Sequence, residues 1–186
     1  RIGDPSLLAA EMGRQSALKA MESAGVEPGE VDIVIVSTAT PDRWLPSTAC
    51  DVQTLLGCDN ALAFDIQAAC SGWLYGLTMA EGFLAAGRGE VALVVATEKM
   101  SNILDWEDRA TCVLFGDGSG AAVLKPSDGQ RGILSAHHRS DGSLAELLYR
   151  PAGGVRIPLD AQVVGEREHL MKMSGREIFK NAVRSM

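Results

Sequence analysis

The sequence predicts an α/β fold in which a mixed, mainly parallel β-sheet carries helices on both faces. Two apolar, largely β-branched runs, Asp32–Ser37 and Val91–Ala96, are typical of strands buried on both faces of a parallel sheet. Helical patterns of about 10 to 16 residues separate the extended runs, which is the arrangement of parallel β-α-β units. We expect one domain, because the chain shows no fixed-period repeat and no Pro/Ser-rich linker.

The helices are predicted from their end signals. Asp4 is a good N-cap and Pro5 suits the first helical position, so the first helix is expected to begin there. An alanine-rich amphipathic pattern continues to Gly25, a suitable residue just beyond a helix end. Two further helices are predicted over 47–57 and over 71–86.

The remaining elements are shorter. We expect another buried strand over Ala61–Ile66, and two extended segments joined by glycines over Thr111–Phe115 and Ala121–Leu124. One more strand is expected over Ile133–Ala136. A loop is expected over Pro151–Gly165, and a final helix over Arg176–Met186. The extended segments among them, together with the strands over 32–37 and 91–96, make up the predicted sheet.

Composition excludes several classes of function. The 186 residues carry a formal net charge of −7, which argues against a dedicated nucleic-acid binder. No apolar run approaches the ~20 residues of a membrane helix, and no signal peptide is recognisable, so we expect a cytoplasmic protein without a membrane partner. The four cysteines form no C-x-x-C pair, so we expect free thiols and no metal site.

Cys70 is the candidate nucleophile. It lies at the bend between the predicted strand 61–66 and the helix 71–86, where the unpaired N–H groups of the helix favour a thiolate. Small neighbours, Ala68 to Gly72, would leave room for a substrate and let backbone N–H groups approach an oxyanion. This is the pattern of a nucleophile elbow with sulfur in place of oxygen. The alternative is a buried structural cysteine, because Cys is often buried.

Three other patterns have simpler interpretations. Gly116-x-Gly118-x-x-Ala121 matches a degenerate dinucleotide fingerprint, but an extended segment follows it where the fingerprint requires a helix. His137 and His138 are adjacent and so would diverge on a strand, which favours surface histidines over a metal site. His169 is interpreted as a solvated side chain, and the loop 105–109 as either a ligand-contacting loop or a solvated turn anchored by its tryptophan.

Taken together, these segments resemble a known family. The sequences AFDIQAACSGWLYGL (63–77), DWEDR (105–109) and FGDGSGAAVL (115–124) are similar to those of β-ketoacyl-acyl-carrier-protein synthase III, a thiolase-fold condensing enzyme. With shorter matches at 45–47, 141–143 and 173–180, these segments lie in the family's order along the chain. The resemblance implies a thiolase-like fold, of which residues 1–186 would be the N-terminal domain, one half of a duplicated fold that is incomplete at both ends.

The resemblance assigns roles to five residues. Cys70 matches the nucleophile that takes the acyl group, and Arg109 matches an arginine that helps to hold coenzyme A. Phe115 and Leu148 match positions that line the acyl pocket, and Leu45 matches the residue that reaches across a homodimer into the partner's pocket. The family's catalytic histidine and asparagine belong to a C-terminal half that is absent here, so neither role is transferred to any residue of this chain.

The implied activity is a decarboxylative Claisen condensation of an acyl-coenzyme A with malonyl-acyl-carrier-protein, which initiates fatty acid synthesis. It would proceed through an acyl-cysteine intermediate, with no metal or redox cofactor and with the coenzyme A thioester as substrate. Two alternatives stay open. One is a related condensing enzyme of polyketide or secondary metabolism, and the other is a non-catalytic thiolase-fold scaffold.

Overall fold

The computed structural model describes residues 2–127, 129 and 132–185, which pack as two compact units. The first unit takes in residues up to Lys99 together with Asp117–His138. The second takes in Met100–Gly116 and the residues from Arg139 onward. The chain therefore leaves the first unit after β3, returns to it for β4, and leaves it again.

The first unit is built on a four-stranded sheet with helices on both of its faces. In chain order its main elements are α1 (Ala9–Ala24), β1 (Ile33–Ser37), α2 (Thr48–Leu56), β2 (Leu62–Ile66), α3 (Gly72–Ala85), β3 (Ala92–Glu98) and β4 (Gly118–Leu124). The strand order is β2-β1-β3-β4, with β1 parallel to both β2 and β3, and β4 antiparallel to β3. The predicted mixed, mainly parallel sheet is confirmed.

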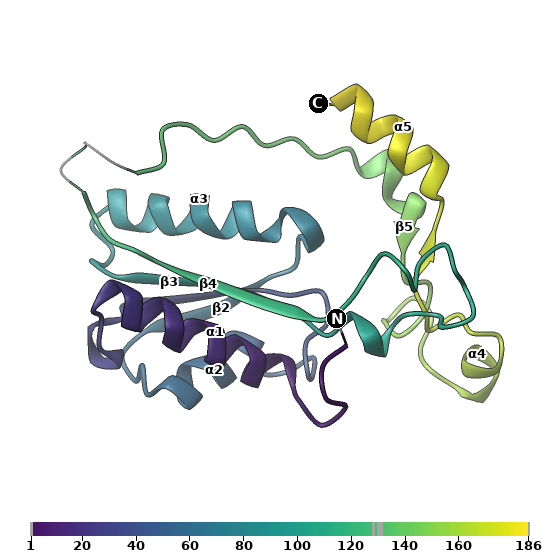
Figure 1. Ribbon diagram of the computed structural model, residues 1–186, viewed down its shortest axis with the longest axis horizontal. Coiled ribbons are helices and arrows are strands. Elements are labelled where there is room, and N and C mark those ends of the chain that lie inside the picture. Colours follow the sequence, from purple (N-terminus) through teal and green to yellow (C-terminus); the bar gives the residue numbers. More distant parts are fainter. Residues whose placement is uncertain (1, 128, 130–131, 186) are drawn as a thin grey trace. The chain divides into compact units, whose positions relative to one another are not determined.

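Figure 1 shows α3 on one side of the sheet and α1 and α2 on the other, and each face has its own apolar cluster. Val34 and Val36 of β1 pack toward α1 and α2, whereas Ile33 and Ile35 of the same strand pack toward α3. This alternation follows from the two-residue period of a strand. Since helices cover both faces, β1 is buried along its whole length, as its continuous β-branched sequence predicts.

The predicted buried strands are confirmed for β1 and β3. For Ala61–Ile66 the predicted strand forms, but the prediction that it is buried is wrong. β2 is a strand there, but it lies at the edge of the sheet, and Leu62 is 51% exposed. β4 begins earlier than expected, since Gly118, Ser119 and Gly120 already pair with β3. A strand therefore follows Gly116, and the segment is no dinucleotide-binding turn.

The first helix does not begin at Asp4. That residue forms a local turn in which its carboxylate accepts from Ser6, and α1 begins only at Ala9. The carboxylate that caps α1 belongs to Asp42, which accepts from the N–H groups of Ala9 (2.8 Å) and Ala10 (2.9 Å). The predicted end at Gly25 is confirmed, because Gly25 is left-handed with φ 61°.

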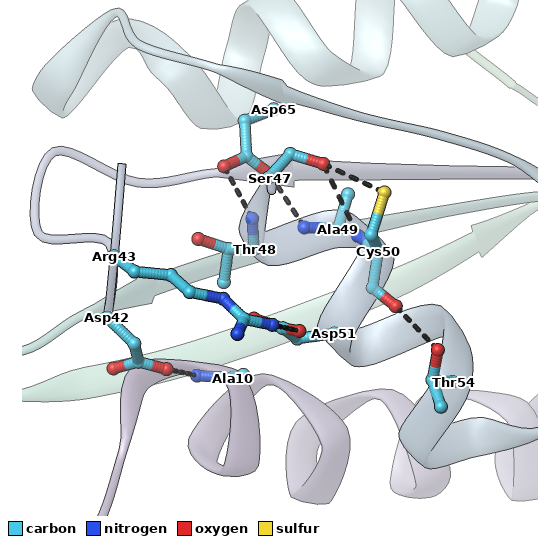
Figure 2. Close-up of polar contacts among 10 residues, drawn as sticks. All are labelled: Ala10, Asp42, Arg43, Ser47, Thr48, Ala49, Cys50, Asp51, Thr54 and Asp65. Carbon is cyan, nitrogen blue, oxygen red and sulfur yellow. Dashed lines mark hydrogen bonds and ion pairs between the residues drawn. The ribbon is translucent and has the colours of Figure 1, made fainter. Parts of the chain in front are cut away.

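A second carboxylate caps α2 from the edge strand (Figure 2). Asp65 of β2 accepts from the N–H groups of Thr48 (2.8 Å) and Ala49 (2.7 Å). The Ser47 side chain accepts from the next donor, the N–H of Cys50. The first turn of α2 is thus satisfied jointly by its own N-cap and by a strand that follows it in the chain.

The second unit contains mostly short elements. They are η3 (Met100–Asn102), η4 (Gly142–Leu147), β5 (Leu148–Tyr149), α4 (Ala161–Gly165), β6 (Lys172–Met173) and α5 (Gly175–Ser185), and β5 pairs with β6 in an antiparallel ladder. The predicted final helix is confirmed as far as Ser185, and the predicted loop 151–165 is wrong at its end, where α4 forms.

Two predicted extended segments are not strands. Residues 111–114 form turns, because Asp108 accepts from Thr111 and Cys112, and the Thr111 carbonyl accepts from the Leu114 N–H. Residues 133–136, in the first unit, pair with no strand among the described residues. Within the part of the chain that is described, no helix is both long and apolar enough to cross a membrane.

Replacing Asp65 by Ala should test the cap on α2. The change leaves the Thr48 and Ala49 N–H groups without an acceptor in a buried turn, so the free energy of unfolding should fall by about 2 kcal/mol. Urea unfolding of the intact protein measures this value. Asp59→Ala is the matched control, since Asp59 is exposed in a turn. Equal stability of the two variants would contradict the capping role.

Candidate active site

Cys70 lies on a tight turn at the carboxyl end of the edge strand. β2 ends at Ile66, a 3₁₀ turn (η2, Ala69–Ser71) follows, and α3 begins at Gly72. The elbow predicted from the sequence is therefore present, with Ser71 rather than Cys70 at the N-cap position of α3. Ligand sites of α/β sheets lie at this carboxyl edge of the parallel strands.

The turn is strained at the residue before the cysteine. Ala69 has φ 45°, in the left-handed region that residues with a Cβ avoid. Such backbone conformations cluster at functional sites, because the surrounding structure has to enforce them. The sequence gives no signal for this, since alanine is not a residue that marks positive φ.

Gly72 explains how the turn is held. A Cβ placed on Gly72 would lie 1.8 Å from Oγ of Ser37, the last residue of β1. The first turn of α3 therefore rests directly on the end of the central strand. The expectation that Gly72 leaves room for a substrate is wrong at this position, because the Ser37 side chain takes that space.

Cys70 itself is open to solvent. Its side chain is exposed, which excludes the alternative of a buried structural cysteine. The N–H of Ser71 donates to Ala68 (3.1 Å) and that of Gly72 donates to Ala69. Within the described residues the Cys70 N–H donates to no acceptor, so it is available to an oxyanion formed next to the sulfur.

The other three cysteines differ from Cys70 in exposure. Cys58 is buried, and its burial, aided by the nearby Asp59 carboxylate, raises the pKa of the Cys58 thiol. Cys50 and Cys112 are partly buried. The Cys50 sulfur also accepts a hydrogen bond from Ser47 (3.2 Å), as Figure 2 shows. Cys70 is thus the most accessible thiol of the four.

The loop 105–109 belongs to the second unit and is organised by an arginine distant in sequence. Arg167 pairs with Asp105 at 2.9 Å and also with Glu107, and these carboxylates raise the pKa of Arg167 further. Arg167 has φ 62°, so its backbone is also strained. The sequence offers no signal for this role, and the loop is not the turn anchored by its tryptophan that was one expectation, since Trp106 is 50% exposed.

Arg109 lies in this loop with its charge available. Its side chain is exposed, and among the described residues it forms no ion pair. Arg167 already compensates Asp105 and Glu107, while Asp108 accepts from Ala110 and Thr111. The loop therefore presents a free guanidinium, a group suited to phosphate or an aromatic base.

The remaining predicted site residues are divided between the two units. Phe115 and Leu148 are partly buried in the second unit, where Leu148 belongs to β5 and pairs with Met173 of β6. Leu45 is in the first unit with Cys70 and is 86% exposed, just before the cap of α2. The structure thus groups Arg109 and Phe115 with Leu148, and Leu45 with Cys70.

The histidines make local contacts. His138 Nε2 lies 2.8 Å from the Thr78 hydroxyl, and its ring packs edge-on against Tyr75 at 5.0 Å. His169 is partly buried, so its interpretation as a solvated side chain is wrong. Across residues 2–127, 129 and 132–185, no three His, Cys, Asp or Glu side chains come together as metal ligands.

Comparisons with known proteins identify relatives of this chain. The family model for 3-oxoacyl-[acyl-carrier-protein (ACP)] synthase III matches residues 64–142, which include Cys70, the loop 105–109 and β4. The β-ketoacyl-[acyl-carrier-protein] synthase III of Natranaerobius thermophilus is 48% identical over 99% of this chain and 57% of the relative. The chain spans about half the length of the curated relatives it matches.

Solved structures share the fold over the whole chain. The crystal structure of 3-oxoacyl-[acyl-carrier-protein] synthase III from Aquifex aeolicus is 42% identical, with a TM-score of 0.86 over all of this chain and 55% of that protein. The priming β-ketosynthase of the R1128 polyketide biosynthetic pathway is 35% identical, with a TM-score of 0.84 over 99% of this chain and 54% of that protein. By sequence and by fold, this chain belongs to the β-ketoacyl-acyl-carrier-protein synthase III family of thiolase-fold condensing enzymes, of whose members it spans about half.

Proposed function

We propose that the intact protein is a 3-oxoacyl-acyl-carrier-protein synthase III that condenses an acyl-coenzyme A with malonyl-acyl-carrier-protein. The observation that carries the proposal is the exposed Cys70 on a strained turn between β2 and α3. The full-length relatives named β-ketoacyl-[acyl-carrier-protein] synthase III support the reaction class. We further propose that residues 1–186 form the N-terminal domain of that enzyme and that it acts in the cytoplasm.

The first half-reaction is acyl transfer to Cys70. The thiolate of Cys70 attacks the thioester carbonyl carbon, a C–S bond forms, and the negative charge moves to the carbonyl oxygen. The free N–H of Cys70 donates to that oxyanion. When the tetrahedral intermediate collapses, its bond to the coenzyme A sulfur breaks, and coenzyme A leaves as a thiolate that takes up a proton.

The second half-reaction forms the carbon–carbon bond. Malonyl-acyl-carrier-protein loses carbon dioxide, and the electron pair of the broken C–C bond attacks the acyl carbon on Cys70. The Cys70 sulfur then leaves as the thiolate that began the cycle, and the product is a 3-ketoacyl thioester of the carrier protein. No electron is gained or lost overall, so the reaction requires no redox cofactor.

The other predicted residues are proposed as binding groups. The free guanidinium of Arg109 would hold the nucleotide portion of coenzyme A, for which its exposure and lack of an ion pair suit it. Phe115 and Leu148 would line the acyl pocket. Leu45, with most of its side chain exposed, would close the pocket of a partner subunit.

A polyketide-priming condensation is the second candidate. It is favoured by the likeness to the priming β-ketosynthase of the R1128 pathway, which matches nearly the whole chain. The cysteine elbow serves both reactions, so the carrier protein discriminates between them. Condensation with a fatty-acid-type malonyl-acyl-carrier-protein supports the first proposal, and activity restricted to a polyketide carrier protein supports the second.

Thiol labelling should single out Cys70. In the intact protein at neutral pH, substoichiometric iodoacetamide should modify Cys70 ahead of the other three cysteines, because Cys70 is exposed and burial disfavours the Cys58 thiolate. Prior incubation with an acyl-coenzyme A should protect the same sulfur. Peptide mass spectrometry reads both results, and equal labelling of all four thiols would contradict the assignment.

Replacing Cys70 by Ser should abolish condensation. A hydroxyl is a far weaker nucleophile than a thiolate, so formation of 3-ketoacyl product should fall by roughly 10³-fold or more. Cys112→Ser is the matched control and should retain activity. If the intact unsubstituted protein forms no acyl-cysteine with any acyl-coenzyme A, the alternative of a non-catalytic scaffold is favoured.

The edge strand should lie near the axis of a homodimer. β2 leaves one of its sides unpaired among the described strands, and Leu62 on it is half exposed, which suits pairing with a second copy. Sedimentation of the intact protein at micromolar concentration should show a dimer. Leu62→Lys should weaken it, and a monomer of the unsubstituted protein under these conditions would refute the proposal.

A further inference from the structure

A buried ion pair lies at the point where the chain leaves and re-enters the first unit. Lys99 Nζ is 3.3 Å from Asp117 Oδ2, and the two side chains are only 5% and 2% exposed. Lys99 is the last residue of the first unit before residues 100–116, and Asp117 is the first residue after them. We call residues 100–116 the excursion.

The pair continues the β3–β4 ladder by one step. The last registered partners of these antiparallel strands are Glu98 and Gly118, so Lys99 and Asp117 are the next residues opposite each other. An opposite-charge pair in such a position links the two strands directly. The residues that precede and follow the excursion are therefore joined by their side chains as well as by the sheet.

Further contacts fix both members of the pair. The Gly3 N–H donates to Asp117 Oδ2 (2.8 Å), and Lys99 Nζ donates to the carbonyl of Asp4 (2.7 Å). The Lys99 N–H donates to Thr40 Oγ1 (2.7 Å), and that hydroxyl donates to Glu98. A Cβ on Gly3 would lie 2.9 Å from Lys99 Nζ, so the absence of a side chain there lets the N-terminal segment reach the pair.

Stability alone is a weak explanation for a buried Lys99–Asp117 ion pair. Removing both from water is expensive, and an apolar pair of similar volume is often at least as stable. An ion pair with several fixed hydrogen bonds differs from an apolar pair in that it specifies one geometry. The residues that this geometry would serve are those of the excursion, which include Arg109 and Phe115.

We propose that Lys99 and Asp117 are positioning residues for coenzyme A binding: their buried pair orders the base of the excursion and thereby the segment that carries Arg109. This inference rests on the proposed function for its substrate, an acyl-coenzyme A. Neither residue touches the substrate. The pair acts through the backbone of residues 100–116, whose outer part is tied within its own unit by Arg167.

The test is a double variant, Lys99→Met with Asp117→Asn, in the intact protein. It removes both charges together, and Asn keeps an oxygen for the Gly3 N–H. The matched control, Arg14→Met with Glu11→Gln, makes the same kind of change at a partly buried ion pair of the same unit, whose two side chains are each 31% exposed. Asp117→Asn alone is used if the double variant does not fold.

Two measurements decide the outcome. Hydrogen exchange should accelerate at amides bonded within the excursion, such as those of Ile103, Cys112 and Leu114, and stay unchanged in the β3–β4 ladder. The KM for the acyl-coenzyme A should rise roughly tenfold while kcat stays within about twofold, because binding rather than chemistry is altered. The control variant should change neither.

Three results would overturn the proposal. They are unchanged exchange in the excursion, exchange raised equally throughout β3 and β4, or a fall in kcat with KM unchanged. If the unsubstituted protein turns over no acyl-coenzyme A, the proposed function has failed, and with it the substrate role of the pair. The exchange comparison then still decides whether the pair orders the excursion.

Discussion

The close contact between α3 and the sheet is the constraint on which the candidate site depends. A Cβ on Gly72 would overlap the Ser37 side chain, and a Cβ on Gly76 would lie 2.8 Å from Cγ1 of Val94. The two glycines are four residues apart and so share one face of the helix. Because this face is bare backbone, α3 settles onto β1 and β3 at a distance that other residues would forbid. The starting point of α3, and with it the turn that carries Cys70, is fixed relative to the central strand.

The fixed position of α3 explains the strained backbone at Ala69. The chain has to travel from the edge strand β2 to a helix that already rests on β1, and few residues are available for the bend. A left-handed alanine costs about 1 to 3 kcal/mol, which packing of α3 on the sheet offsets. The exposure of the Cys70 thiol on this turn is consequently a result of how α3 packs on the sheet.

The sequence was sufficient where a residue's structure depends on its neighbours in the chain. The buried strands β1 and β3, the end of α1 at Gly25 and the elbow at Cys70 all follow from local patterns. The sequence was insufficient where a group distant in the chain determines the local structure. α1 begins at Ala9 because Asp42 caps it, the loop 105–109 is shaped by Arg167, and β2 is an edge strand because no other described strand pairs beyond it. Alternating apolar residues cannot report which strands lie side by side.

The two carboxylates that cap α1 and α2 also bear on the order in which the chain can fold during synthesis. Asp42 follows α1 in the chain and Asp65 follows α2, so each helix emerges from the ribosome before the carboxylate that caps it. A nine-residue helix such as α2 is shorter than the ~12–15 residues an isolated helix needs in water. α2 therefore becomes stable only when β2, which carries Asp65, returns to it, and the sheet of the first unit is complete only after β3 and β4 have joined it.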